Sequence, residues 1–413
     1  MKRLLFALSL TLMSGLSAPT SSAQQAQNTS TNAVNPAVRR AKELAQVIDA
    51  GKLADSVMLT STMLMEALLS PVSVLAQSRV SQPDITIDAA TRVDIIEGVI
   101  KRLNDYYVFP EIARQMETAI RQRMRNKEYD QITSAALLAQ TLTLHLHAVN
   151  PDRHLGVTYS YQPVPLNDGK TEPTSEQLER MRQFAASVNY GFEKIDRLEG
   201  NIGYLRIDGF MPADVGGETA IASMNFLANT DALIIDMRYS SNGGDPSMSV
   251  LLSSYLFDKP VHLDDFYWRE GNRTEQIWTM PYVPGKRYIG KDVYFLASKG
   301  TISAGEGFVY ELQNLKRATV IGETTAGAAN PGFEYRINEH FKIFVPIGRA
   351  ISPITKTNWE GIGIKPDVAV PAEQALNTAH LIALKKLLAT ATDERRKKRL
   401  NGFIETLEKQ QSK

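Results

Sequence analysis

The chain has 413 residues, of which 43% are hydrophobic and 22% charged, and its formal net charge is +1 at pH 7. These fractions are ordinary for a globular protein of one to three domains, and a charge near zero gives no indication of nucleic-acid binding. There is no cysteine, which excludes disulfides, thiolate metal sites, cysteine nucleophiles and a lipid-modified N-terminal cysteine.

Residues 1–23 have the pattern of a secretion signal. Lys2 and Arg3 form the charged start, residues 4–16 form a mostly apolar core, and small residues lead to an expected cleavage after Ala23. The apolar run is short for a membrane span. We therefore expect a periplasmic or secreted protein, with no membrane span once the signal has been removed.

Residues 24–85 are expected to form a linker followed by a helical extension. Residues 24–36 are rich in Asn, Gln, Ser and Thr, a composition that favours disorder. Residues 53–75 are rich in Met and Leu, but two acidic residues and a proline interrupt them. This pattern is typical of a buried or partner-facing helix rather than a membrane span.

Residues 86–160 are predicted to form a small helical domain. Apolar residues recur at helical spacing from Val93 to Leu103 and again from Ile112 to Met124. A connecting loop and helix are expected over residues 161–189, where the loop is rich in Pro, Asp, Gly and Thr.

Residues 190–372 are predicted to form an α/β core. Short apolar runs typical of strands, such as residues 202–207 and 232–236, alternate with segments of helical spacing. Residues 373–413 are expected to form a helical tail. Its basic run, residues 395–399, is interpreted as a solvated helix face.

Ser303 lies between an apolar run, residues 292–298, and a segment of helical spacing that begins near Glu306. A hydroxyl at a strand-to-helix junction is fixed and accessible, and the backbone N–H groups beside it can stabilise an oxyanion. Serine is also a favourable N-cap residue. On this segment alone, the N-cap role is the simpler interpretation.

A serine nucleophile needs a base, and the base needs a group that orients it. Among the six histidines, His154 differs because it lies in a turn-rich segment, residues 150–156, and loops often carry catalytic groups. Glu360 lies in another turn, residues 358–367, where a surface role is the alternative.

Two glycine-rich segments, residues 239–245 and 322–327, follow strand patterns. Glycines at a strand exit allow close approach of a ligand, and their N–H groups can point at an anion; a tight turn is the alternative. Neither segment has the spacing of a phosphate loop or a dinucleotide-binding loop. We therefore expect no nucleotide cofactor.

Four motifs in this order resemble the tail-specific (C-terminal processing) serine protease family, most of all the branch of the tricorn core and the interphotoreceptor retinoid-binding protein modules. The motifs are Asp236–Gly244, Ser303–Glu306, Gly322–Gly327 and Gly361–Asp367. The resemblance covers about residues 86–371. It implies an α/β fold with a ClpP/crotonase-like spiral ββα core and an N-terminal helical domain, with no cofactor and no metal.

The family has two catalytic designs, and this sequence resembles the one that uses serine, histidine and glutamate. Where the other design has a lysine base, this chain has Ala328. The resemblance implies Ser303 as the nucleophile, His154 as the general base, and Glu360 as the group that orients the imidazole.

The same resemblance implies an oxyanion hole formed by the N–H of Ala304 and that of Gly243 or Gly244. The loop before these two glycines is one residue longer than the usual pattern. The choice between Gly243 and Gly244 is therefore open.

The sequence predicts an exported serine peptidase that acts on peptides or proteins, with homo-oligomerisation left open. The alternative is a non-catalytic carrier of small hydrophobic ligands on the same fold, as in the retinoid-binding modules. A carrier, however, has no need of Ser303, His154 and Glu360 together. The stretch between helical domain and core is too short for an inserted PDZ-type module.

Overall fold

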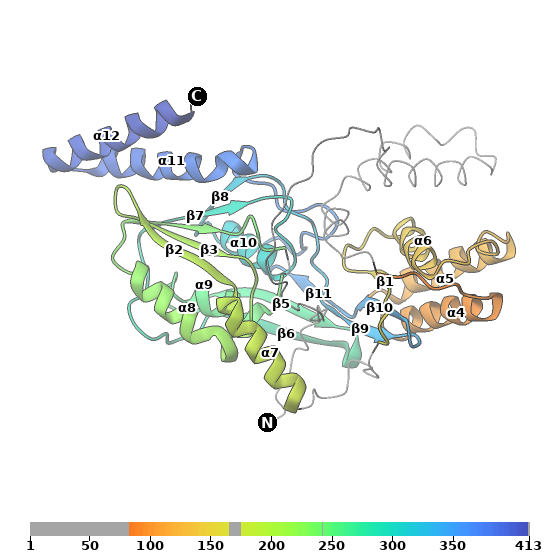
Figure 1. Cartoon of the computed structure of the whole chain (residues 1–413). Coiled ribbons are helices and arrows are strands. Elements are labelled where there is room, and N and C mark those ends of the chain that lie inside the picture. The colour runs from red at the N-terminus through yellow and green to blue at the C-terminus, as the bar shows by residue number, and fades with distance from the viewer. Residues whose placement is uncertain (1–81, 165–174, 242, 412–413) are drawn as a thin grey trace, which may run out of the picture. The chain divides into compact units, whose positions relative to one another are not determined.

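The computed structural model describes residues 82–164, 175–241 and 243–411 (Figure 1). The expected signal sequence, and nearly all of the expected linker and helical extension, lie outside the described residues. Within the described ranges, no helix has both the length and the apolar character that crossing a membrane requires.

Three helices form the N-terminal part, together with a short strand that follows them. They are α4 (Ala89–Tyr106), α5 (Pro110–Arg125), α6 (Ala135–His147) and strand β1 (Gly156–Tyr159). Helix α4 begins after Asp88, whose carboxylate accepts the N–H of Thr91 at 2.7 Å. Most of the apolar residues that recur at helical spacing are buried, among them Ile96, Leu103 and Met116, whereas Val93 is exposed.

This helical part shares its apolar core with a hairpin from much later in the chain. The hairpin consists of β9 (Gly332–Arg336) and β10 (Phe341–Pro346), and β1 pairs antiparallel with β10. The register places Gly156 opposite Phe344. The loop between α6 and β1, which contains His154, is thereby tied to the later part of the chain.

A six-stranded sheet forms the centre of the α/β core. Its strand order is β12 (Val368–Ala369), β8 (Thr319–Gly322), β7 (Asp292–Ala297), β4 (Ala232–Asp236), β3 (Ile202–Ile207) and β2 (Phe192–Leu198). Strands β2 and β3 are antiparallel and the other neighbouring pairs are parallel. Every residue of β4 is buried, which explains its continuous apolar run.

Helices cover both faces of this sheet. Leu233 and Ile235 face the side covered by α8 (Ala213–Leu227), α9 (Pro246–Ser254) and α10 (Ala304–Asn314). Ile234 faces the side covered by α11 (Ala375–Thr390) (Figure 1). Successive side chains of a strand point to opposite faces, so one apolar run supplies two cores. The predicted α/β core with an N-terminal helical domain is confirmed.

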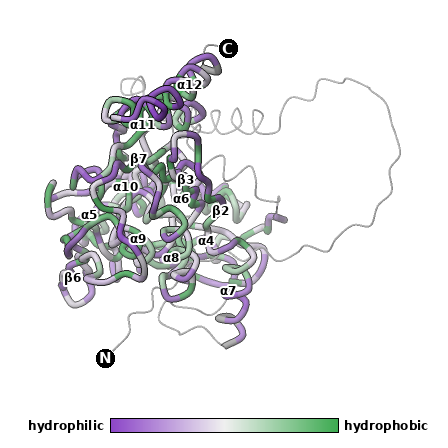
Figure 2. Tube along the Cα trace, turned by 90° about the vertical axis from the view of Figure 1, so that its left-hand side faces the viewer, coloured by the Kyte–Doolittle hydropathy of each residue, from purple (hydrophilic) through white to green (hydrophobic). Residues whose placement is uncertain are grey.

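The remaining elements lie around these two parts. They are α7 (Ser175–Ser187), α12 (Glu394–Gln411), the sheet β11 (Gly348–Ile351), β5 (His262–Trp268), β6 (Arg273–Trp278), and the 3-10 helices η1 (Asn189–Gly191), η2 (Glu270–Asn272) and η3 (Ala372–Gln374). Helix α12 is largely hydrophilic (Figure 2). Within its basic run, Arg396 pairs with Asp231 at 2.9 Å, whereas Arg395, Lys398 and Arg399 are exposed.

Candidate active site

Ser303 directly precedes the first residue of α10, after the turn that follows β7. Its backbone has φ 57° and ψ −126°, a region that residues with a Cβ rarely adopt. Such a conformation costs on the order of 1–3 kcal/mol and persists only where the surroundings hold it. The N–H of Ser303 donates to the Glu306 carboxylate at 2.9 Å. This bond stabilises the turn that presents the hydroxyl.

Glu306 is a structural residue of the site that the sequence analysis treated only as part of a motif. Its buried carboxylate also accepts the hydroxyl of Thr325 and the N–H groups of Gly327 and Ala328, the latter two at 2.7 and 2.9 Å. Burial raises the pKa of Glu306, and these hydrogen bonds oppose the rise. The carboxylate therefore ties the Ser303 turn to the loop after β8.

His154 lies beside Ser303. Its Nε2 is 3.1 Å from the Oγ of Ser303, and its ring stacks on Phe344 with the ring centroids 5.5 Å apart. Burial lowers the pKa of His154, and the negative charge of Asp152 opposes this shift. A neutral imidazole at hydrogen-bond distance from a hydroxyl has the geometry of a general base.

Glu360 is close to His154 but has no hydrogen bond to its ring. Its carboxylate accepts backbone N–H groups from Arg153 at 2.8 Å, Ala329 at 2.6 Å and Asn330 at 3.1 Å. Burial and the charge of Asp152 raise the pKa of Glu360 to about 7, against the effect of these three donors. Glu360 thus connects the His154 loop to the segment that precedes β9.

Asp152 completes the cluster and is a site residue that no sequence motif indicated. It is fully buried, its Oδ2 accepts the Tyr107 hydroxyl and the Asn330 side-chain amide at 3.0 Å each, and its Oδ1 accepts the His154 N–H at 3.2 Å. Its position two residues before His154, in the same turn-rich segment, was the available signal.

Asp152, His154 and Glu360 each place one nitrogen or oxygen within 4.8 Å of the others. Three such side chains can in principle hold a metal ion. Here, however, all four carboxylate oxygens already accept an N–H or O–H donor. The two carboxyl groups therefore serve as acceptors for neighbouring N–H and O–H groups, which does not favour a cation site.

The two glycines of the expected oxyanion hole both have positive φ, +59° at Gly243 and +121° at Gly244. A Cβ on Gly243 would lie 2.5 Å from the Cβ of Ser303, whereas a Cβ on Gly244 would lie 2.1 Å from the carbonyl oxygen of Phe210. Neither glycine N–H donates to another group among the described residues. Gly243 is thus the glycine beside the nucleophile, and Ala304 follows Ser303 at the start of α10.

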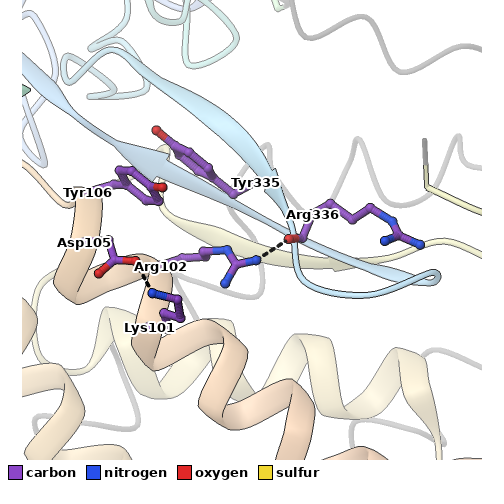
Figure 3. A pocket seen from close by; sticks show the side chains of 6 residues that line it. All are labelled: Lys101, Arg102, Asp105, Tyr106, Tyr335 and Arg336. Carbon is purple, nitrogen blue, oxygen red and sulfur yellow. Dashed lines mark hydrogen bonds and ion pairs between the residues drawn. The ribbon is translucent and has the colours of Figure 1, made fainter. Parts of the chain in front are cut away.

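A pocket on the N-terminal part includes none of these residues. It has a cavity volume of about 170 Å³ and is lined by Lys101, Arg102, Asp105, Tyr106, Tyr335 and Arg336 (Figure 3). Tyr106 and Tyr335 stack with centroids 4.2 Å apart, and Arg102 donates to the Arg336 carbonyl at 3.0 Å. These side chains join α4 to β9, which gives them a structural role.

Comparison with known families gives two matches, which cover separate parts of the chain. The family described as Peptidase family S41 matches residues 201–370. The N-terminal domain of Peptidase_S41 in eukaryotic IRBP matches residues 87–196. The resemblance expected from the four motifs is thereby confirmed.

Two curated proteins are similar to the chain. A carboxy-terminal-processing protease of Bartonella bacilliformis is 26% identical over 185 residues, which are 42% of this chain and 40% of that protein. The chloroplastic carboxyl-terminal-processing peptidase 2 of Arabidopsis thaliana is 26% identical over 173 residues, 41% of this chain and 32% of that protein. The matches thus span less than half of either relative.

Solved structures also resemble the chain. A putative peptidase from Parabacteroides merdae has a TM-score of 0.49 at 19% identity and covers 68% of this chain and 90% of its own. The tricorn protease has a TM-score of 0.45 at 14% identity, and the match covers 77% of this chain and 37% of the tricorn chain.

Proposed function

We propose, because this chain belongs to peptidase family S41, that it is a serine peptidase in which Ser303 attacks the peptide bonds of protein substrates. The observation that carries this proposal is the distance of 3.1 Å between the Oγ of Ser303 and the Nε2 of His154. The two residues are 149 positions apart, and a serine that only caps a helix needs no imidazole at this place.

The proposed reaction has two stages. The Oγ of Ser303 forms a bond to the carbonyl carbon of the substrate while its proton passes to Nε2 of His154. The imidazolium then gives this proton to the leaving amine as the peptide C–N bond breaks, which leaves an ester on Ser303. A water molecule, deprotonated by His154, hydrolyses the ester and restores the serine.

The developing oxyanion would be bound by the N–H groups of Ala304 and Gly243. The close approach of Gly243 to Ser303 favours it over Gly244, which lies against Phe210. Replacement of Gly243 by alanine is expected to reduce hydrolysis by at least about 100-fold, because a Cβ there displaces Ser303 and strains a positive φ.

Glu360 is proposed as the third member of the triad. It accepts the N–H of Arg153, the residue directly before His154, and so holds the loop that presents the imidazole. Its part is therefore to orient His154 through the backbone.

We also propose that the protein is exported, from the charged start and short apolar core of residues 1–23. N-terminal sequencing of the protein purified from its native cells tests this directly. A mature chain that begins at Gln24 supports export, and an intact Met1 contradicts it.

The test of the proposed activity is a fluorophosphonate probe, which reacts with activated serines. We expect labelling of the full chain at Ser303, and loss of labelling in Ser303→Ala and His154→Ala, with hydrolysis of fluorescein-labelled casein lost in parallel. Circular dichroism checks that both variants are folded. Absence of labelling in the folded wild-type chain would instead favour the non-catalytic carrier.

A further inference from the structure

We infer that Asp152 is the carboxylate that positions the His154 imidazole and stabilises its protonated form, with Glu360 holding the loop. This inference rests on the proposed function and adds a positioning residue to its site. Three observations support it: the donors that surround each carboxyl group, the hydrogen bond from the His154 N–H to Asp152, and the absence of a hydrogen-bond partner for His154 Nδ1 among the described residues.

The surroundings of Asp152 supply hydrogen-bond donors to both of its oxygens. It has no exposed surface, and three donors from separate parts of the chain reach its two oxygens. A carboxylate that accepts several hydrogen bonds is stabilised in its charged form. Asn150 donates to the hydroxyl oxygen of Tyr107 at 2.7 Å, so the Tyr107 O–H is free to donate to Asp152. Burial and the charge of Asp152 raise the pKa of Tyr107, which keeps this donor protonated.

Glu360 is the member of the pair that is not bonded to His154 itself. Its carboxylate accepts the N–H groups of Arg153, Ala329 and Asn330, and burial together with the charge of Asp152 raises its pKa. Asp152 accepts the N–H of His154. Asp152 is therefore the carboxyl group in direct contact with the residue that carries the imidazole.

The third observation concerns His154 itself. Its Nδ1 is buried and has no hydrogen-bond partner among the described residues, whereas its backbone N–H donates to Oδ1 of Asp152. When Nε2 accepts the serine proton, a positive charge appears on a ring that has a buried anion beside it. Asp152 thus fixes the backbone of His154 and opposes that charge at the same time.

Other charged or titratable groups around the ring do not replace Asp152. Arg153 is exposed and positive, and burial lowers the pKa of His147, whose Nε2 is 2.6 Å from the carbonyl oxygen of Leu155. Burial raises the pKa of Tyr107, and burial together with the charge of Asp152 raises that of Glu360. Among the described residues, Asp152 is the acidic side chain that accepts a hydrogen bond from His154 itself.

The experiment compares Asp152→Asn with Glu360→Gln in the full chain. Each variant is followed by two titrations: the pH dependence of fluorophosphonate labelling and casein hydrolysis, and the pKa of the His154 ring by NMR. In Asp152→Asn we expect the His154 pKa to fall by about one unit and the plateau rate to fall by about 10²–10⁴-fold. In Glu360→Gln we expect a smaller loss of about 10–100-fold, because the loop that presents His154 is held less firmly, and a His154 pKa within about 0.3 units of the wild type.

Asp130→Asn is the matched control, because it makes the same substitution at an exposed position of the N-terminal part, and no change is expected. If Asp152→Asn does not fold, Asp152→Ser replaces it, since it removes the charge and leaves a hydroxyl that can bond to Tyr107 and Asn330. A lower His154 pKa in Asp152→Ser supports the inference, and an unchanged one contradicts it.

The outcomes separate the two claims. A His154 pKa that moves in Glu360→Gln and not in Asp152→Asn overturns the role of Asp152, whatever the activity. A wild-type chain that neither reacts with the probe nor hydrolyses casein overturns the proposed function, and the NMR titration still decides which carboxylate acts on His154.

Discussion

Helix α10 carries two buried glutamates with opposite surroundings. Glu306, in its first turn, accepts four hydrogen bonds from the Ser303 turn and from the loop after β8. Glu311, further along the helix, faces Asp264 of β5, and its Oε2 has no hydrogen-bond partner among the described residues. The same helix therefore buries one glutamate whose carboxylate is surrounded by hydrogen-bond donors and another whose Oε2 has none among the described residues.

The difference shows two ways in which the desolvation cost of a buried carboxyl group is reduced. At the start of α10, donors from two segments stabilise the carboxylate, which in turn holds those segments together. Further along, burial and the neighbouring carboxyl group raise the pKa of Glu311, and burial raises that of Asp264 to about 7. That pair avoids charge by keeping a proton, as isolated buried acids do.

The largest expected effect is at the start of the helix. Ser303→Ala is expected to reduce the hydrolysis of labelled casein by at least about 10⁴-fold, because the attacking oxygen is removed. Its unfolding free energy should change by less than about 1 kcal/mol, since the N–H of residue 303 still donates to Glu306. Activity assays and urea unfolding measure the two quantities. A stability loss as large as the activity loss would mean that Ser303 is a structural cap.

The second effect concerns Asp264, whose pKa is raised to about 7 in the folded protein, against ~3.9 in an unfolded chain. Its contribution to stability is then fully present below about pH 4 and is lost as the pH rises through 7. We expect Asp264→Asn to remove this loss and to be ~4 kcal/mol more stable at pH 8 than the wild type, relative to their difference at pH 4. Unfolding curves at both pH values measure it, and a difference independent of pH would contradict it.

The next effect tests the hydrogen bonds that stabilise the buried Glu306 carboxylate. In Glu306→Gln, an amide NH₂ faces donors in place of a carboxylate oxygen, so we expect a destabilisation of ~3 kcal/mol. Glu311→Gln is the matched control on the same helix and should be neutral or stabilising at pH 8, because its carboxyl group has no such donors. Equal destabilisation of the two variants in urea unfolding would refute the contrast.

The smallest effect measures the strain at Ser303. Glycine adopts φ 57° without the cost that a Cβ imposes, so Ser303→Gly should be ~1 kcal/mol more stable than Ser303→Ala, although both are inactive. If alanine proves the more stable of the two, the turn is not strained.

Much of the fold follows from local patterns. The runs 202–207 and 232–236 were predicted as strands and coincide with β3 and β4, because strands buried on both faces read as continuous apolar segments. The pairing of β1 with β10 was not predictable from the sequence, since it joins residues nearly 190 positions apart and no local pattern records a partner. The limits of the expected domains stay predictions.

The candidate site was predicted in part. Ser303 and His154 were selected from motifs, and the structure places their side chains 3.1 Å apart. Glu306 and Asp152 were missed as individual residues because their roles depend on donors from distant segments, such as Gly327 and Tyr107. A carboxylate in a sequence does not reveal whether it will be buried.

The strand pair β1–β10 also bears on when activity can arise during biosynthesis. The loop with His154 is made early, but its strand waits for residues 341–344, and the carboxylate of Glu360 that ties the loop is made later still. A nascent chain on the ribosome that contains Ser303 and His154 therefore still lacks the segments that hold them together. The candidate site can therefore assemble only after the residues up to Glu360 have been translated.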